Sequence, residues 1–155
     1  MPAAVSRRTL DFRNGSDVIA EVERLKASGY DRLGKWNLSQ ICDHLGKTTE
    51  AGLRPKGKRM PWILRKLFGE PMTRSALKNR GMKAGGMTAK FLLPDTKVVD
   101  EQPELIDRYL NLVQEADAFP GPLPPYILCD IELEDWKQLQ WIHAAHHLGF
   151  LIPKV

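Results

Sequence analysis

The sequence predicts an all-α protein, an up-down-up-down bundle of four helices. In four segments apolar residues recur every three or four positions, the period of a helix that packs one face on a core. Capping residues, glycine or proline stand at the ends of these segments, and no segment has the alternation of a half-buried strand. A chain of 155 residues can bury one core, so we expect a single domain over residues 1–155.

Two helices are predicted in the first third of the chain. The first begins at Ser16, a good N-cap, continues through Lys26 and ends at residues 28–29, with core positions at Val18, Ile19, Val22 and Leu25. The second begins at the N-cap Asn37, and its apolar stripe consists of Leu38, Ile41, Leu45 and Thr48. His44 lies within this stripe, so we expect its imidazole to face the core.

Two further helices are predicted in the last third. One covers residues 103–118, with Pro103 at the first helical position, where proline is favoured. A proline-rich connector follows over residues 119–126, and residues 126–131 are expected to be briefly extended. The last helix runs from about residue 134 to residue 150 and ends before Pro153.

A basic insertion separates the second predicted helix from the third. Residues 54–97 contain twelve Lys or Arg but only two acidic residues, whereas the other 111 residues carry a net charge of −6. Glycines and prolines divide this segment, leaving two short predicted helices at 62–68 and 73–80 and a loop over 81–94. We expect the apolar residues of 62–68 to pack over the end of the bundle, and the less favoured alternative is an amphipathic interfacial helix.

Three interpretations of the basic segment stay open. It forms a solvated surface without a partner, or a rim that attracts an anionic small-molecule substrate, or a nucleic-acid surface. The last is the least favoured, because Trp62 and Phe68 are the only aromatic residues among its early charges and no recognition motif accompanies them.

The chain lacks the features of secreted and membrane-spanning proteins. It has no run of about 18 apolar residues and no apolar stretch near its N-terminus. Cys42 and Cys129 form no CxxC motif. We therefore expect a cytoplasmic protein with reduced thiols and no membrane partner.

The most informative stretch is the last predicted helix, which holds three of the four histidines. His143 and His147 are four residues apart, so their rings share one helix face, as in helices that offer two ligands to one metal ion. If this helix packs against the second, His44 completes a three-histidine site for zinc, nickel or ferrous iron. Three imidazoles leave a coordination position open, as in catalytic sites. The alternative is three core histidines bonded to backbone carbonyls.

Four more residues are candidates for the surroundings of this site. His146 lies at the edge of the same face. Its candidate roles are a proton shuttle and a structural residue. Asp43 is next to His44 in sequence but points about 100° away from it around the helix. We therefore expect Asp43 to lie outside the metal's ligands, at the surface or behind them. Trp136 is placed to wall the pocket, and Gln40 to orient a ligand. No catalytic residue can be named from the sequence.

Two stretches carry a resemblance to a known family. Trp36 followed by Gln40-Ile-Cys-Asp-His-Leu45 resembles the start of the second helix of DinB-like (YfiT-like) proteins, and the Trp136…His-Ala-Ala-His-His-Leu-Gly-Phe150 segment resembles their last helix. The resemblance implies a four-helix bundle, a homodimer and a divalent metal bound by His44, His143 and His147. It also implies the activity of a metal-dependent transferase or isomerase that uses a low-molecular-weight thiol such as bacillithiol or mycothiol. The basic insertion departs from the family pattern.

The sequence thus supports two kinds of function. The first is a metal-dependent enzyme, a thiol-dependent S-transferase or a related hydrolase or isomerase, in which the basic segment recruits an anionic cosubstrate. The second is a non-catalytic binding or stress-associated module whose basic segment contacts an acidic partner or nucleic acid. A structural role of the metal is a further alternative, and chelation would then unfold the protein.

Overall fold

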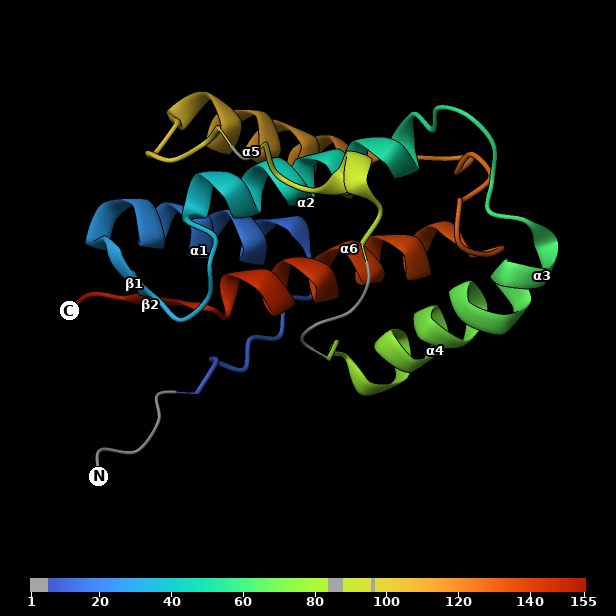
Figure 1. The fold of residues 1–155 in the computed structure, drawn as a ribbon, viewed down its shortest axis with the longest axis horizontal. Helices are drawn as coiled ribbons and strands as arrows, with labels where there is room; N and C mark the ends of the chain where they lie inside the picture. Colours follow the sequence, from blue (N-terminus) through green and yellow to red (C-terminus); the bar gives the residue numbers. More distant parts are fainter. Residues whose placement is uncertain (1–5, 84–87, 96) are drawn as a thin grey trace.

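The computed structural model describes residues 6–83, 88–95 and 97–155 and is mostly helical, as predicted (Figure 1). The four longest helices are α1 (Gly15–Ser28), α2 (Leu38–Leu53), α5 (Pro103–Ala118) and α6 (Leu133–Leu148). They coincide with the predicted helices to within about two residues at most ends. α6 ends at Leu148, two residues earlier than predicted, because the chain turns there into a short strand.

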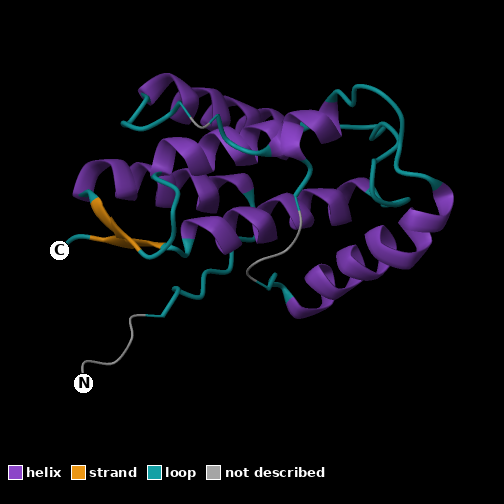
Figure 2. Cartoon of the chain, in the orientation of Figure 1, coloured by secondary structure: helices purple, strands orange, loops and turns teal. Residues whose placement is uncertain are grey.

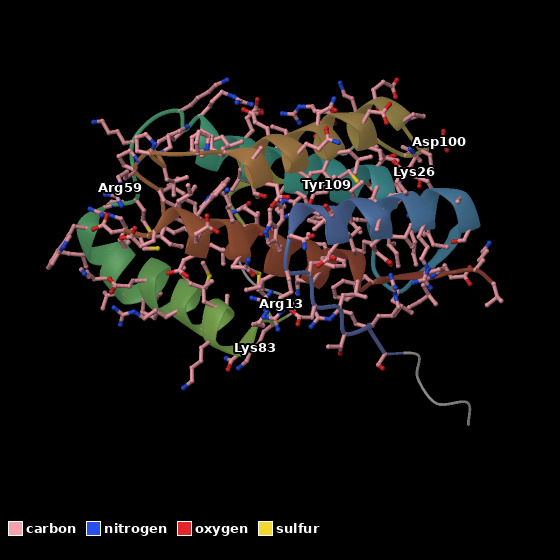
Figure 3. The ribbon with its side chains drawn as sticks, turned by 180° about the vertical axis from the view of Figure 1, so that it is seen from behind. Arg13, Lys26, Arg59, Lys83, Asp100 and Tyr109 are labelled. Carbon is pink, nitrogen blue, oxygen red and sulfur yellow. The ribbon has the colours of Figure 1, made fainter. Side chains whose placement is uncertain are left out.

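These four helices bury one hydrophobic core. Its members come from every predicted helical stripe, and Tyr109 of α5 lies among side chains between the helices (Figure 3). Burial of this apolar surface is the main term that holds the helices together. The fully or nearly fully buried side chains include Val18, Val22, Leu25, Leu38, Ile41, Leu45, Val113, Trp136, Trp141 and Leu148.

The directions of the helices differ from the prediction. Ser39, at the start of α2, bonds Gln102 just before α5, and Arg54, just after α2, pairs with Glu115 near the end of α5. α2 and α5 are therefore parallel. Gly15 and Lys137, at the starts of α1 and α6, both contact Asp117 at the end of α5.

The order is consequently up-down-down-up, and the predicted up-down-up-down order is wrong. A parallel helix pair requires a connection that returns along the length of a helix, about 24 Å for 16 residues. The residues between Leu53 and Pro103 provide this return.

A capping box begins α2. The Asn37 side chain accepts from the backbone N–H of Gln40, and the Gln40 side chain accepts in turn from the backbone N–H of Asn37. α1 begins earlier than predicted, because Asn14 is its N-cap in place of Ser16 and accepts from Asp17 N.

Two three-residue strands were not predicted. β1 (Tyr30–Arg32) and β2 (Leu151–Pro153) pair antiparallel with Tyr30 opposite Pro153, and they lie at the end of the molecule away from α3 (Figure 2). Residues 126–131, expected to be extended, form no strand.

The basic segment contains one nearly continuous helical run. α3 (Trp62–Leu64), the π-helical turn η1 (Arg65–Gly69) and α4 (Glu70–Asn79) follow one another without a gap, so the break predicted between residues 68 and 73 is wrong. Pro71, which has no N–H to donate, stands in the first turn of α4 directly after the π-helical turn, where the regular hydrogen-bond pattern changes.

The rest of the segment passes back over α2. A 3-10 turn, η2 (Lys90–Leu92), interrupts the predicted 81–94 loop, and residues 84–87 of that loop lie outside the described part. No helix in the described part of the chain is both long and apolar enough to cross a membrane.

Candidate metal centre

Antiparallel packing of α2 on α6 brings three predicted ligands together. His44 on α2 faces His143 and His147 on α6, and one ring nitrogen from each lies within 4.8 Å of the others. His44 is only 1% exposed, whereas His143 and His147 are partly exposed. The cluster therefore has a buried side formed by α2 and a side that solvent reaches.

Two of the three Nε2 separations match those between ligands of one small ion. His44 Nε2 lies 3.1 Å from His143 Nε2, which lies 3.0 Å from His147 Nε2. Two nitrogens bound at about 2.0–2.1 Å to one ion at angles between 90° and tetrahedral are about 2.9–3.4 Å apart. Zinc, nickel and ferrous iron all accept such nitrogens.

The protonation of His44 is set by the backbone of η2. Its Nδ1 lies 2.6 Å from the carbonyl oxygen of Leu92, which can only accept a hydrogen bond. Nδ1 must therefore carry the proton, and in the neutral ring Nε2 presents a lone pair. Metal-binding histidines in proteins commonly donate their other N–H in this way.

Thr48 faces the other ring nitrogen of His143. Its hydroxyl oxygen lies 2.9 Å from Leu45 O and 3.5 Å from His143 Nδ1. When the hydroxyl donates to Leu45 O, it can only accept from Nδ1, and His143 Nε2 then presents a lone pair toward His44. In that tautomer a proton from His147 Nε2 satisfies one of the two facing lone pairs, whereas a cation between the rings satisfies all three nitrogens.

Burial keeps the cluster uncharged. Burial lowers the pKa of His44 and, more strongly, those of His143 and His147, and the neighbouring histidines lower the last two further. Neutral imidazole is the form that binds metals.

Trp36 forms a wall of the cluster. Its ring is tilted against His44 at 5.2 Å between centroids and stacked on His147 at 5.3 Å. From the sequence, Trp36 is expected to pack in the core or at its rim, and it is part of the family motif. Thr48, found on the α2 stripe, was not recognised as a partner of the site, although it lies four residues after His44 on the same face.

His146 stands beside the cluster without joining it. Its Nδ1 accepts from the guanidinium of Arg7, which also donates to Met82 O and lies 5.2 Å from the Phe150 ring centroid. Burial and the charge of Arg7 lower the pKa of His146 to about 4. His146 thus anchors the N-terminal segment next to His147, whose ring is 4.8 Å away.

Asp43 contacts the segment that follows η2. Its buried carboxylate accepts from Lys47 Nζ at 2.9 Å and from the backbone N–H of Asp95 at 3.1 Å. Lys47 Nζ also donates to Leu93 O at 2.8 Å. These contacts hold the segment after η2 on α2, and with it the Leu92 carbonyl that orients His44.

Two candidates serve other purposes in the structure. The Gln40 side chain caps α2, one turn before His44. Trp136 is fully buried two helical turns before His143, where its ring covers Gly52 so closely that a Cβ there would lie 2.4 Å from it. The prediction that Trp136 walls the pocket is wrong, because at that distance from His143 the ring belongs to the core.

Residues 4–154 match a protein family that is described as a protein of unknown function (DUF1569). The chain belongs to this family. The match includes all three histidines of the cluster. A comparison with curated proteins found no match, and a comparison with solved structures also found none. Functional arguments therefore start from the geometry of the cluster.

Proposed function

We propose that this protein binds one divalent metal ion through Nε2 of His44, His143 and His147 and acts as a metal-dependent enzyme. The observation that carries the proposal is the convergence of the three imidazole nitrogens, with the proton of His44 held on the far side of its ring by the Leu92 carbonyl. The donor set suits zinc, nickel or ferrous iron, and three nitrogens leave a position for another ligand.

The packing supports the DinB-like four-helix bundle that the sequence resemblance implies. Four helices surround one core, and the three histidines occupy the helices on which that resemblance places the ligands. In this proposal residues 54–97 are a basic insertion that provides the return connection between α2 and α5.

A bound divalent ion lowers the pKa of a coordinated water or thiol and polarises a carbonyl, which suits an S-transferase, hydrolase or isomerase. The chain's own residues hold and orient the three rings, and Trp36 covers one side of them.

The positive charge of Arg7 favours an anionic substrate, such as a low-molecular-weight thiol that bears carboxylates. Arg7 contacts His146, beside the cluster, and forms no ion pair with any described residue. Such a charge raises the local concentration of anions.

The test is the metal content of untagged protein, measured by mass spectrometry beside a His143→Ala, His147→Ala double variant. The proposal expects about one ion per wild-type chain and none in the variant. Absence of any ion after reconstitution with zinc, nickel and ferrous iron would refute it.

A second arm separates a catalytic ion from a structural one. Chelation should leave the circular dichroism of the helices largely unchanged if the ion is catalytic, and metal-loaded protein should turn over thiol or hydrolytic substrates that the apoprotein does not. Unfolding on chelation would instead assign the ion a structural role.

A further inference from the structure

The helical run from α3 through η1 into α4 presents its large apolar side chains to solvent. Trp62 is 63% exposed, Ile63 60%, and Leu67 and Phe68 each 62%. Leu64 and Met72 are also exposed. The spacing of Ile63, Leu64, Leu67, Phe68 and Met72 places them on one side of the run. The expectation that residues 62–68 pack over the bundle is therefore wrong.

Close packing on the other side of the run fixes this orientation. Gly69 lies against the backbone of Leu128, where a Cβ would be 2.0 Å from the carbonyl oxygen. Thr73 and Ala76 are buried, and Ala76 packs with Leu139 and Ile142 of α6. Gly69, Thr73, Ala76 and the half-buried Leu77 already occupy this inner side, and the close approach at Gly69 keeps the run from rolling to bury Leu67 or Phe68.

The segment that carries the exposed apolar side is also strongly basic. Residues 54–80 contain nine Lys or Arg and a single acid, Glu70. Glu70 forms ion pairs with Lys66 and Arg74. Arg59, which Figure 3 shows at the end of the molecule that holds this run, pairs with Asp130. Lys56, Lys58 and Lys78 are exposed and form no ion pair with any described residue.

We propose that this run is an interfacial anchor that lies flat on an anionic phospholipid bilayer. Leu67, Phe68 and their apolar neighbours would enter the boundary between headgroups and acyl chains, while the lysines reach lipid phosphates. The proposed anchor reverses the expectation of no membrane partner. It does not require a membrane-spanning helix, and none is found among the described residues, because an interfacial helix does not cross the bilayer.

Charge favours an anionic bilayer over a second copy of the chain as the partner of this run. Two copies joined through this run would bring two strongly basic surfaces together, which is unfavourable, whereas an anionic bilayer complements both the charge and the apolar side. A nucleic acid would satisfy the charge but would leave most of the aliphatic side chains exposed.

The experiment measures co-sedimentation of the full chain with vesicles of phosphatidylcholine, with and without phosphatidylserine. The test variant is Phe68→Glu, and Val99→Glu is the matched control, because Val99 is 77% exposed and lies outside the run. We expect binding to the anionic vesicles alone, weakened at least about tenfold by Phe68→Glu and unchanged by Val99→Glu. Replacing Lys56 and Lys58 with Gln should weaken binding about fivefold per lysine.

Three results would overturn the proposal. One is failure of the wild type to bind anionic vesicles, and another is equal binding by Phe68→Glu and Val99→Glu. The third is self-association, seen by ultracentrifugation without vesicle binding and abolished by Phe68→Glu, which would assign the run to a second copy. Because Phe68 is exposed, the variant should keep the wild-type circular dichroism and metal content. The result is thus independent of the metal proposal.

Discussion

The Nε2 atoms of His44 and His143 lie 3.1 Å apart on antiparallel helices, and the Leu92 carbonyl holds the His44 proton on Nδ1, at the opposite side of that ring. Thr48 Oγ1 lies 3.5 Å from Nδ1 of His143. When both rings carry their proton on Nδ1, two lone pairs face each other, and a cation between them removes their repulsion. Two groups outside the cluster, the Leu92 carbonyl and the Thr48 hydroxyl, favour this state.

Thr48→Val should weaken zinc binding about tenfold, because it removes the acceptor that keeps the proton on His143 Nδ1. Thr48→Ser retains the hydroxyl and should bind zinc like the wild type. The measurement is competition with a chromophoric chelator at neutral pH. Equal affinities for the valine and serine variants would show that the hydroxyl does not orient His143.

Asp43→Ala should also weaken zinc binding, by roughly tenfold, although Asp43 is not a ligand. Its carboxylate holds the backbone of Asp95 and the ammonium group of Lys47, and so the segment that contains Leu92. Asp107→Ala, an exposed substitution on α5, is the control and should leave affinity unchanged. If the two variants bind zinc alike in isothermal titration, the segment after η2 does not support the site.

Gly52→Ala should destabilise the fold by about 1–3 kcal/mol, because its Cβ would collide with the Trp136 ring. Gly46→Ala in the same helix is the control, since its Cβ would come no closer than 3.4 Å to a flexible arginine. Urea denaturation measures both. The metal content of refolded Gly52→Ala protein should equal that of the wild type, because Trp136 lies outside the site, and a loss of metal would contradict this.

Acid should destabilise the metal-free protein as the pH falls from about 6.5. The pKa values of His44, His143 and His147 lie below the ordinary value in the folded state, and that of His146 is about 4. The unfolded chain therefore takes up protons that the folded chain excludes, so its free energy falls relative to the folded state.

Urea midpoints of the metal-free protein between pH 7.5 and pH 5.5 test this pH dependence, a window chosen above most carboxylate titrations. A triple variant with Gln at positions 44, 143 and 147 should have a shallower slope. A wild-type midpoint that is constant or rises on acidification would contradict the assignment of neutral rings.

Local signals in the sequence predicted the helices and the three histidines. These signals can be read within a short stretch of sequence. They are the cap at Asn37, the proline at position 103, the apolar periodicity and the spacing of His143 and His147. The parallel direction of α5 could not be predicted, because the long connection after Leu53 allows either direction. The strands at residues 30–32 and 151–153 are too short to show alternation.

Other contacts have no sequence signal at all. The Leu92 carbonyl that orients His44 is a backbone group that every residue has. The outward side of the run that contains Phe68 follows from the close approach of Gly69 to Leu128, which depends on tertiary packing.

X-ray absorption spectroscopy of the zinc-loaded protein at neutral pH tests the central claim most directly. The account predicts a first shell of about three imidazole nitrogens at about 2.0–2.1 Å plus one further ligand such as a water oxygen, with the outer-shell scattering of the imidazole rings. His44→Ala should lose imidazole scattering or fail to retain the ion. A first shell dominated by carboxylate oxygens or sulfur, or an unchanged spectrum in His44→Ala, would contradict it.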